Sequence, residues 1–188
     1  MSLAGKTIAA TCTLVLAAGL AACGKNEEQG VKEPAREGLS LDLAGIDYNV
    51  FITRELNPQI PPDSAYYKGP PAKKGQTLYG VFLQACNNGT KPQPTASHFI
   101  VKDNQGNEFH PSPLPADNDF SYQPTRLDPH ECQPEAGSVA ELGPTAGSML
   151  LFKLPLAKTE NRPLELEVAA PASVPHPNHP KLTFTLDL

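Results

Sequence analysis

Apolar and polar side chains alternate along much of the carboxyl-terminal part of the chain. In one run, Leu164, Leu166 and Val168 are separated by Glu165 and Glu167. This period of two is typical of a strand with one buried face, because successive side chains point to opposite sides of the backbone. We therefore expect a series of short strands. The runs that fit are residues 39–56, 97–102, 108–110, 148–154, 163–169 and 181–188.

Two of the apolar runs make more specific predictions. In the run 39–56, the alternation predicts that one face of the strand carries Tyr48, Val50, Ile52 and Arg54. The run from Gln76 to Cys86 is almost continuously apolar, which is typical of a strand covered on both faces. Between these runs lies the proline-rich connection Pro58–Gly75. It is long for a compact domain, and connections of this length are commonly functional or mobile.

Proline content determines the fold class that we expect. The chain contains 21 prolines and no tryptophan, and no stretch has a useful helical period of 3.6 residues. Proline removes a backbone donor and clashes within a helical turn, whereas it is compatible with loops and edge strands. The pattern therefore predicts an all-β domain in which two antiparallel sheets pack as a sandwich.

The amino terminus has the features of an export signal. After Lys6, residues 7–22 carry no charge, and this stretch is shorter than the roughly 20 residues of a membrane-spanning helix. Leu20-Ala21-Ala22-Cys23 resembles the lipobox of bacterial lipoproteins. That resemblance implies a signal peptide over 1–22 and a diacylglyceryl group on the Cys23 thiol. An ordinary secretory signal with a chance cysteine is the alternative.

Composition changes again after Cys23. Residues 23–38 are polar and low in apolar side chains, which indicates a disordered tether that follows the lipidated cysteine. The remaining residues, 39–188, suffice for one domain. The formal net charge of the chain is −5 and no basic patch is present, so nucleic acid is not expected as a partner.

Two cysteines, Cys86 and Cys132, lie in the expected domain. An even pair in an oxidising compartment indicates a disulfide. The alternatives are two free thiols or half of a metal site, and the sequence leaves them open. Cys12 lies in the expected signal peptide and needs no chemical role.

We find no convincing catalytic set in the sequence. Ser148 follows a glycine but leads into a buried strand pattern rather than the turn that a nucleophilic serine needs. His130 and Cys132 could face the same way on a strand, but the thiol is expected to be oxidised. His176 and His179 could supply two ligands to copper or zinc, whereas the simpler interpretation is a proline-stiffened connector. No cofactor is expected.

The surface offers one candidate for a partner site. A set of charged and aromatic residues brackets the proline-rich connection, namely Arg54, Glu55, Tyr66, Tyr67 and Lys68. Tyrosine and arginine often dominate the energy of protein interfaces. The alternative is that both tyrosines cover the edge of the sandwich, and the sequence does not decide between the two.

Four stretches carry a resemblance to a known class of domain. They are GVFLQACNNG, HFIVKDNQGNEFHP, GSMLLFKLP and PLELEV, within residues 48–168. Together they resemble the immunoglobulin-like domain of many bacterial cell-envelope lipoproteins, in a loose class that includes a secreted mycobacterial antigen. The matching features are structural: turn glycines, core alternation and a proline that ends a strand. The resemblance implies an immunoglobulin-like sandwich in the cell envelope, and it transfers no catalytic residue.

From these features we expect a non-enzymatic protein outside the cytoplasm, held on the bacterial membrane by the lipid at Cys23. Its sandwich would bind a protein or an envelope polymer. The alternative function is metal handling, with Cu or Zn held by histidines such as His176 and His179.

Overall fold

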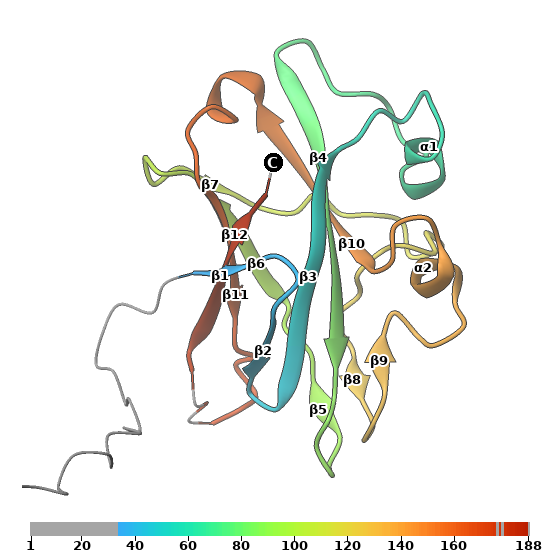
Figure 1. The fold of residues 1–188 in the computed structure, drawn as a ribbon, viewed down its shortest axis with the longest axis vertical. Coiled ribbons are helices and arrows are strands. Elements are labelled where there is room, and N and C mark those ends of the chain that lie inside the picture. The colour runs from blue at the N-terminus through green and yellow to red at the C-terminus, as the bar shows by residue number, and fades with distance from the viewer. Residues whose placement is uncertain (1–33, 176, 178, 188) are drawn as a thin grey trace, which may run out of the picture. The chain divides into compact units, whose positions relative to one another are not determined.

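Two sheets pack face to face in the computed structural model, which describes residues 34–175, 177 and 179–187 (Figure 1). The first sheet has the strand order β1-β12-β11-β6-β7. Its strands are β1 (Ala35–Arg36), β6 (His98–Lys102), β7 (Glu108–Phe109), β11 (Leu164–Ala169) and β12 (Lys181–Leu186). The second sheet has the order β10-β4-β3-β2, and β9 extends it beside the end of β4. Its strands are β2 (Ser40–Leu43), β3 (Ile46–Glu55), β4 (Gln76–Cys86), β9 (Cys132–Gln133) and β10 (Ser148–Pro155).

The connections give the immunoglobulin-like arrangement. The chain crosses from β4 to β6 and β7, returns to β10, and crosses again to β11 and β12, so that β10 pairs with β4 in one sheet and β11 pairs with β6 in the other. This order is typical of Greek-key sandwiches. One pairing departs from the expected antiparallel pattern, because β1 runs parallel to β12. A separate small ladder joins β5 (Gln93–Pro94) to β8 (Arg126–Leu127).

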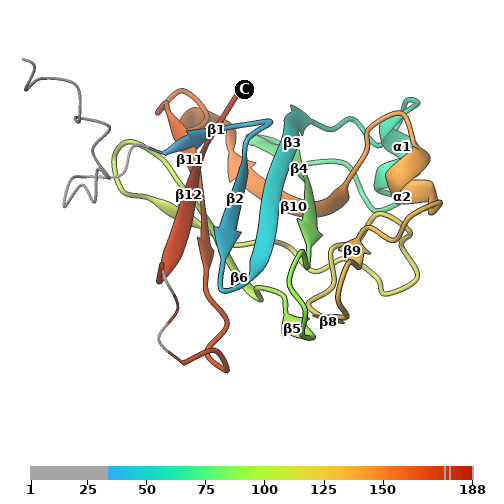
Figure 2. The same ribbon diagram turned by 60° about the horizontal axis from the view of Figure 1, so that its bottom comes forward.

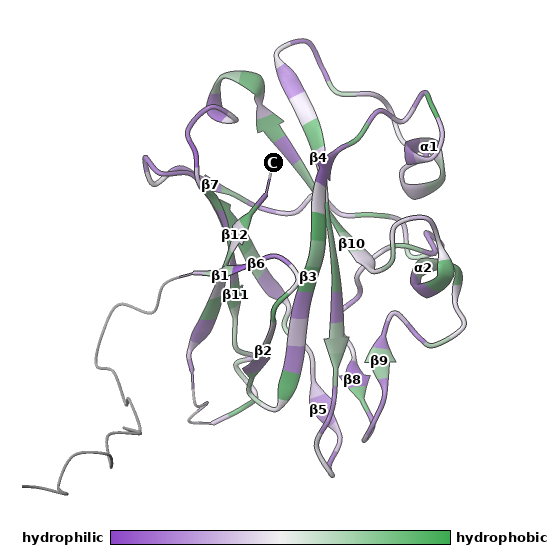
Figure 3. Cartoon of the chain, in the orientation of Figure 1, coloured by the Kyte–Doolittle hydropathy of each residue, from purple (hydrophilic) through white to green (hydrophobic). Residues whose placement is uncertain are grey.

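The main core lies between the two sheets and follows the period of two. From β11 and β12 it takes Leu164, Leu166, Val168, Leu182, Phe184 and Leu186, all buried. Hydrophilic and hydrophobic bands alternate along β3 (Figure 3). The outward-facing Glu167 accepts from Lys181 at 2.6 Å and lies 3.4 Å from Lys102, so these charges remain on the solvent side. Burial raises the pKa of Glu167, but the two ammonium groups lower it by more.

Strand β4 is covered on both faces, as its composition predicts. Tyr79, Val81 and Leu83 enter the core between the sheets, whereas Leu78 and Phe82 join a second cluster on the other side. Strand β10 divides its side chains in the same way and pairs with β4 from Ser148–Leu83 to Pro155–Gln76.

The alternation expected for β3 fails at Phe51. Val50 pairs with Leu83 and Ile52 pairs with Phe82, so Phe51 is an extra residue and forms a β-bulge. A bulge reverses the face of every later side chain. As a result Ile52, expected on the face of Tyr48 and Val50, is 40% exposed, while Thr53 is buried.

Three short helical segments, which the sequence pattern did not predict, lie outside the sandwich. They are α1 (Asp63–Tyr66), α2 (Val139–Leu142) and the 3₁₀ turn η1 (Leu156–Lys158). Figure 2 shows the first sheet, the second sheet and then α1 and α2 as successive layers. Tyr66 of α1 and Ala140 of α2 pack on Phe82, Met149 and Leu151, so the two helices supply part of the second core.

The domain begins before the expected boundary at Leu39. Ala35 and Arg36 already pair with Phe184 and Thr185 of β12. Thr53 then donates its backbone N–H to Glu37 at 3.2 Å. Residues 35–38 therefore belong to the sandwich rather than to the predicted tether. The expected signal peptide, Cys23 and the rest of the tether lie outside the described residues.

Candidate functional site

Three cavities open along one side of the domain, and all of them are lined by residues 111–125. Their volumes are about 350, 720 and 430 Å³. Ser121 and Gln123 line the first two, Pro113 lines the first and third, and Asp119 lines the second and third. The remaining walls come partly from residues 65–70 and 130–138. We call the surface formed by 65–70, 111–125 and 130–138 the loop face.

Backbone hydrogen bonds fix residues 111–125 along the free edge of β10. Ser112 donates to the Leu151 carbonyl at 2.6 Å, and Tyr122 donates to the Met149 carbonyl at 3.1 Å. The Tyr122 hydroxyl donates to the Ala96 carbonyl at 2.9 Å inside the core. Burial raises the pKa of Tyr122 well above its usual value, so the hydroxyl remains a donor. The central wall of the loop face is therefore ordered by the strand behind it.

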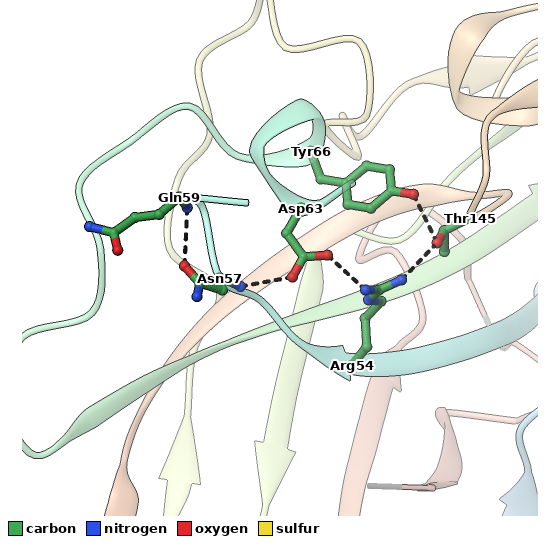
Figure 4. A network of polar contacts seen from close by, with 6 residues as sticks. All are labelled: Arg54, Asn57, Gln59, Asp63, Tyr66 and Thr145. Atoms are coloured by element: carbon green, nitrogen blue, oxygen red, sulfur yellow. Dashed lines mark hydrogen bonds and ion pairs between the residues drawn. The ribbon is translucent and has the colours of Figure 1, made fainter. Parts of the chain in front are cut away.

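A polar network ties the proline-rich connection to the second sheet (Figure 4). Arg54 of β3 donates to Asp63 of α1 at 2.7 Å and to Thr145 at 3.4 Å. Asp63 also accepts the backbone N–H of Asn57 at 2.8 Å. The Tyr66 hydroxyl donates to Thr145 at 3.0 Å. Because the Asp63 side chain is only 7% exposed, its charge depends on these partners.

The partner surface predicted from the sequence needs correction at its tyrosines. Tyr66 is fully buried and Tyr67 is 7% exposed, so neither ring projects from the surface. Tyr66 makes edge-to-face contacts with Phe82 and Phe120, with ring centres 5.0 and 4.8 Å apart. The alternative, that both tyrosines cover the sandwich, is the arrangement observed.

The charged members of that predicted surface have separate environments. Arg54 is bound to Asp63, and Glu55 accepts the Thr77 hydroxyl at 2.5 Å. Lys68 is exposed and lines the cavity of about 430 Å³. The five residues therefore do not form one continuous patch. The sequence analysis grouped these residues because they are close in sequence. That grouping is wrong as a surface patch, because α1 folds back onto β3 and buries part of the set.

The cavity of about 430 Å³ lies between the end of α1 and residues 113–119. We call it the Tyr67 cavity. Its lining includes proline rings and charged side chains. The full set of lining residues is Ala65, Tyr67, Lys68, Gly69, Pro70, Pro113, Pro115, Asp117, Asn118 and Asp119. The Asn118 side chain is used for folding, since it donates to the Tyr66 carbonyl at 2.9 Å and accepts from the Phe120 N–H at 2.9 Å. Both loops of the cavity are thus joined at Asn118.

The two domain cysteines are joined beside the cavity of about 720 Å³. Cys86 at the end of β4 forms a disulfide with Cys132 of β9, with sulfur atoms 2.07 Å apart. Cys132, His130 and Gln133 line the cavity of about 720 Å³. Since Cys132 is oxidised, a nucleophilic pair with His130 is not formed. Ser148 is 2% exposed, which agrees with its rejection as a nucleophile.

The structure describes one of the two histidines in the predicted metal site. His176 lies outside the described residues, whereas His179 lies just before β12. Within the described ranges, no three His, Cys, Asp or Glu side chains come together in a way that could hold a metal ion. Over the same residues, no helix is both long and apolar enough to cross a membrane.

Comparisons with known proteins agree with the fold. No family model matches the chain, and no curated protein matches it significantly. The structure is similar to that of YcdA, a candidate lipoprotein of Bacillus subtilis subsp. subtilis str. 168, with a TM-score of 0.50 at 13% identity. The match covers 79% of this chain and 38% of YcdA, so the chain spans well under half of that relative.

Two smaller proteins match over almost their whole length. YjhA of Bacillus subtilis has a TM-score of 0.49 at 10% identity, over 81% of this chain and 99% of its own. A β-sandwich protein of Clostridium difficile 630 has a TM-score of 0.46 at 14% identity, over 85% of this chain and 100% of its own.

Proposed function

We propose that this protein is a non-enzymatic, lipid-anchored binding protein of the bacterial cell envelope, and that the loop face is its binding surface. The observation that carries the proposal is the convergence of three cavities on residues 111–125, which β10 and Asn118 hold in place. Ligand sites are generally concave and largely preformed. The occupant would be a protein or an envelope polymer.

The export part of the proposal is supported by two observations. The first is the resemblance of Leu20-Ala21-Ala22-Cys23 to a lipobox. The second is the disulfide between Cys86 and Cys132, because disulfides persist mainly in oxidising compartments. Attachment through two or more acyl chains would be stable, since each buried methylene contributes about 0.8 kcal/mol.

Exposed apolar side chains near the loop face also support a binding role. Val139 and Leu142 of α2 are 58% and 72% exposed and lie one helical turn apart, so they project from the same side. Ser138, the residue before them, lines the cavity of about 720 Å³. Apolar side chains beside a concave surface are typical of interaction sites.

Photo-crosslinking in the native host tests the binding surface. A photoreactive amino acid replaces Gln123, which lines two cavities, or Thr183 on the outer face of β12 as the matched control. We expect a discrete covalent adduct from position 123 and none from 183. Adducts from position 183 alone, or none from position 123, would contradict the proposal.

Fractionation of the same cells tests the anchor. We expect wild-type protein in the membrane fraction and the Cys23→Ser variant outside it, because the variant has no thiol to acylate. A Cys23→Ser variant that stays in the membrane fraction would show that the lipid is not what retains the protein.

A further inference from the structure

The hydroxyl of Tyr67 differs from those of the other four tyrosines. Tyr48 accepts from the Ala96 N–H, Tyr122 donates to the Ala96 carbonyl, and Tyr66 donates to Thr145. The Tyr79 hydroxyl bonds the side chain of Thr159. The Tyr67 side chain is nine-tenths buried, yet its hydroxyl has no hydrogen-bond partner among the described residues. The ring is therefore held by packing, while the hydroxyl oxygen, which keeps some contact with solvent, is not used by the fold and is free to bond another molecule.

The position of this hydroxyl connects it to the Tyr67 cavity. A Cβ atom added to Gly69 would lie 2.3 Å from the Tyr67 hydroxyl oxygen, so only glycine leaves room for it there. Gly69 and Tyr67 both line the cavity. The hydroxyl is also not one of the fully enclosed polar atoms, so a molecule in the cavity can reach it.

Three charged side chains surround the same cavity without pairing with one another. Lys68, Asp117 and Asp119 line it, and none of them belongs to an ion pair within the described part of the chain. The apolar part of the lining is formed by three prolines, namely Pro70, Pro113 and Pro115. An apolar wall with a few unpaired polar groups is typical of a small-molecule site.

The chemistry of these groups selects the ligand. Ionised Asp117 and Asp119 only accept hydrogen bonds, the Lys68 ammonium only donates, and the Tyr67 hydroxyl does both. An ammonium group would donate to the two carboxylates and to Tyr67 but would leave Lys68 without an acceptor, and a carboxylate would accept from Lys68 and Tyr67 but would leave Asp117 and Asp119 without a donor. A hydroxyl group can donate and accept, so a ring with several hydroxyls meets all these requirements. Its C–H faces would pack against the prolines.

We propose that the Tyr67 cavity binds a sugar unit of an envelope glycan. This inference rests on the proposed function, because it names the polymer that the loop face would bind. The volume of about 430 Å³ is within the range of about 300–1,000 Å³ that ligand pockets occupy. The Tyr67 hydroxyl, Asp117 and Asp119 bind the sugar hydroxyls, and Lys68 donates to a ring or hydroxyl oxygen.

Fluorine NMR on the full-length protein in detergent tests the site. The chain has five tyrosines, so 3-fluorotyrosine labelling gives five signals, and the signal missing from the Tyr67→Phe variant identifies Tyr67. The probes are glucose, mannose and N-acetylglucosamine at millimolar concentrations. We expect at least one of them to shift the Tyr67 signal in a saturable way, while the Tyr48 and Tyr79 signals stay in place.

A matched pair of variants separates binding from folding. Saturation-transfer NMR on the sugar should show binding to wild type and to Tyr66→Phe, and a loss of at least tenfold in affinity for Tyr67→Phe. Thermal unfolding should separate the variants in the opposite order. Tyr66→Phe should unfold at a lower temperature than wild type, because it loses the hydrogen bond to Thr145. Tyr67→Phe should unfold at the wild-type temperature, because it loses no hydrogen bond within the protein. A Tyr67→Phe variant that binds sugar as wild type does would overturn the assignment.

Two further outcomes are decisive. If no sugar shifts the Tyr67 signal, the sugar proposal is wrong, even if crosslinking from Gln123 still captures a partner and so upholds the proposed function. If 1,5-diaminopentane shifts the Tyr67 signal and the sugars do not, the cavity is a cation site formed by Asp117 and Asp119, and the sugar proposal is again overturned.

Discussion

Asp103 holds the turn between β6 and β7 through both of its carboxylate oxygens. One oxygen accepts the backbone N–H groups of Gln105 at 3.0 Å and Asn107 at 2.8 Å. The other accepts the side-chain amides of Asn107 at 2.6 Å and Asn161 at 2.8 Å. Burial raises the pKa of Asp103, but these four bonds lower it by more, from 3.8 to about 2. The turn is therefore stabilised by the ionised carboxylate.

This shift predicts how acid affects the domain. Because the folded pKa lies below the unfolded value, the stabilisation is complete above about pH 4 and is lost as the pH falls towards 2. Asp103→Asn places an amide donor opposite two other amide donors, so it should lower the free energy of unfolding at neutral pH. The difference between wild type and variant should shrink from about pH 4 to 2, as measured by urea unfolding.

Asp117→Asn is the control for this experiment. Asp117 is exposed and belongs to no ion pair within the described residues. Its substitution should leave the free energy of unfolding nearly unchanged across the same pH range. A constant difference between wild type and Asp103→Asn would show that the carboxylate charge does not stabilise the turn.

At the scale of elements, the start of β10 depends on a glycine. Gly147 has φ +119°, and a Cβ atom there would lie 2.9 Å from the backbone nitrogen of Leu83 in β4. Gly106, in the turn between β6 and β7, also has positive φ (+79°), but nothing lies within 4 Å of the position its Cβ would take. The two glycines therefore share a backbone requirement and differ in packing.

This contrast gives a matched prediction. Gly106→Ala should cost about 1 kcal/mol of unfolding free energy, from the left-handed backbone alone. Gly147→Ala should cost clearly more, because the backbones of β4 and β10 must also separate. Urea unfolding of the two variants measures both costs. Equal costs would mean that β4 and β10 can move apart without penalty.

Several elements could be predicted from the sequence because their signals are local. The apolar run of β4 and the alternation of β11 were sufficient to place those strands and their buried faces. The bulge at Phe51 could not be predicted, because nothing in the alternation marks the residue that is skipped. Helices of four residues, such as α1 and α2, are too short to show a helical period.

The candidate site was less predictable than the strands. Arg54 and Asp63 are nine residues apart, and their contact depends on α1 folding back over β3. Tyr66 and Tyr67 have the composition of an interface, and only the packing on Phe82 shows that Tyr66 belongs to the core. The Tyr67 cavity joins segments almost 50 residues apart. The prolines and the Tyr-Tyr pair near Gly69 were its only local signal.

At the scale of the whole molecule, the disulfide joins β4 and β9 over a sequence separation of 46 residues. In the chain-entropy model, closing such a loop stabilises the fold by about 4 kcal/mol. A variant with Cys86→Ser and Cys132→Ser should therefore unfold at a lower urea concentration, by an amount that corresponds to about 2–4 kcal/mol. When wild type is treated with dithiothreitol, its unfolding midpoint in urea should approach the midpoint of the variant, because the disulfide is then reduced.

The variant itself supplies the control, since dithiothreitol should leave its unfolding midpoint unchanged. Equal midpoints for wild type and variant under oxidising conditions would show that the crosslink adds nothing to equilibrium stability.

The same crosslink also determines what a single proteolytic cut does to the molecule. Residues 111–125, which form the central wall of the loop face, lie between Cys86 and Cys132 in the sequence. A protease that cuts a peptide bond there divides the chain into two fragments that remain covalently attached. Each fragment contributes strands to both sheets, so a nicked molecule keeps its halves together instead of shedding one of them.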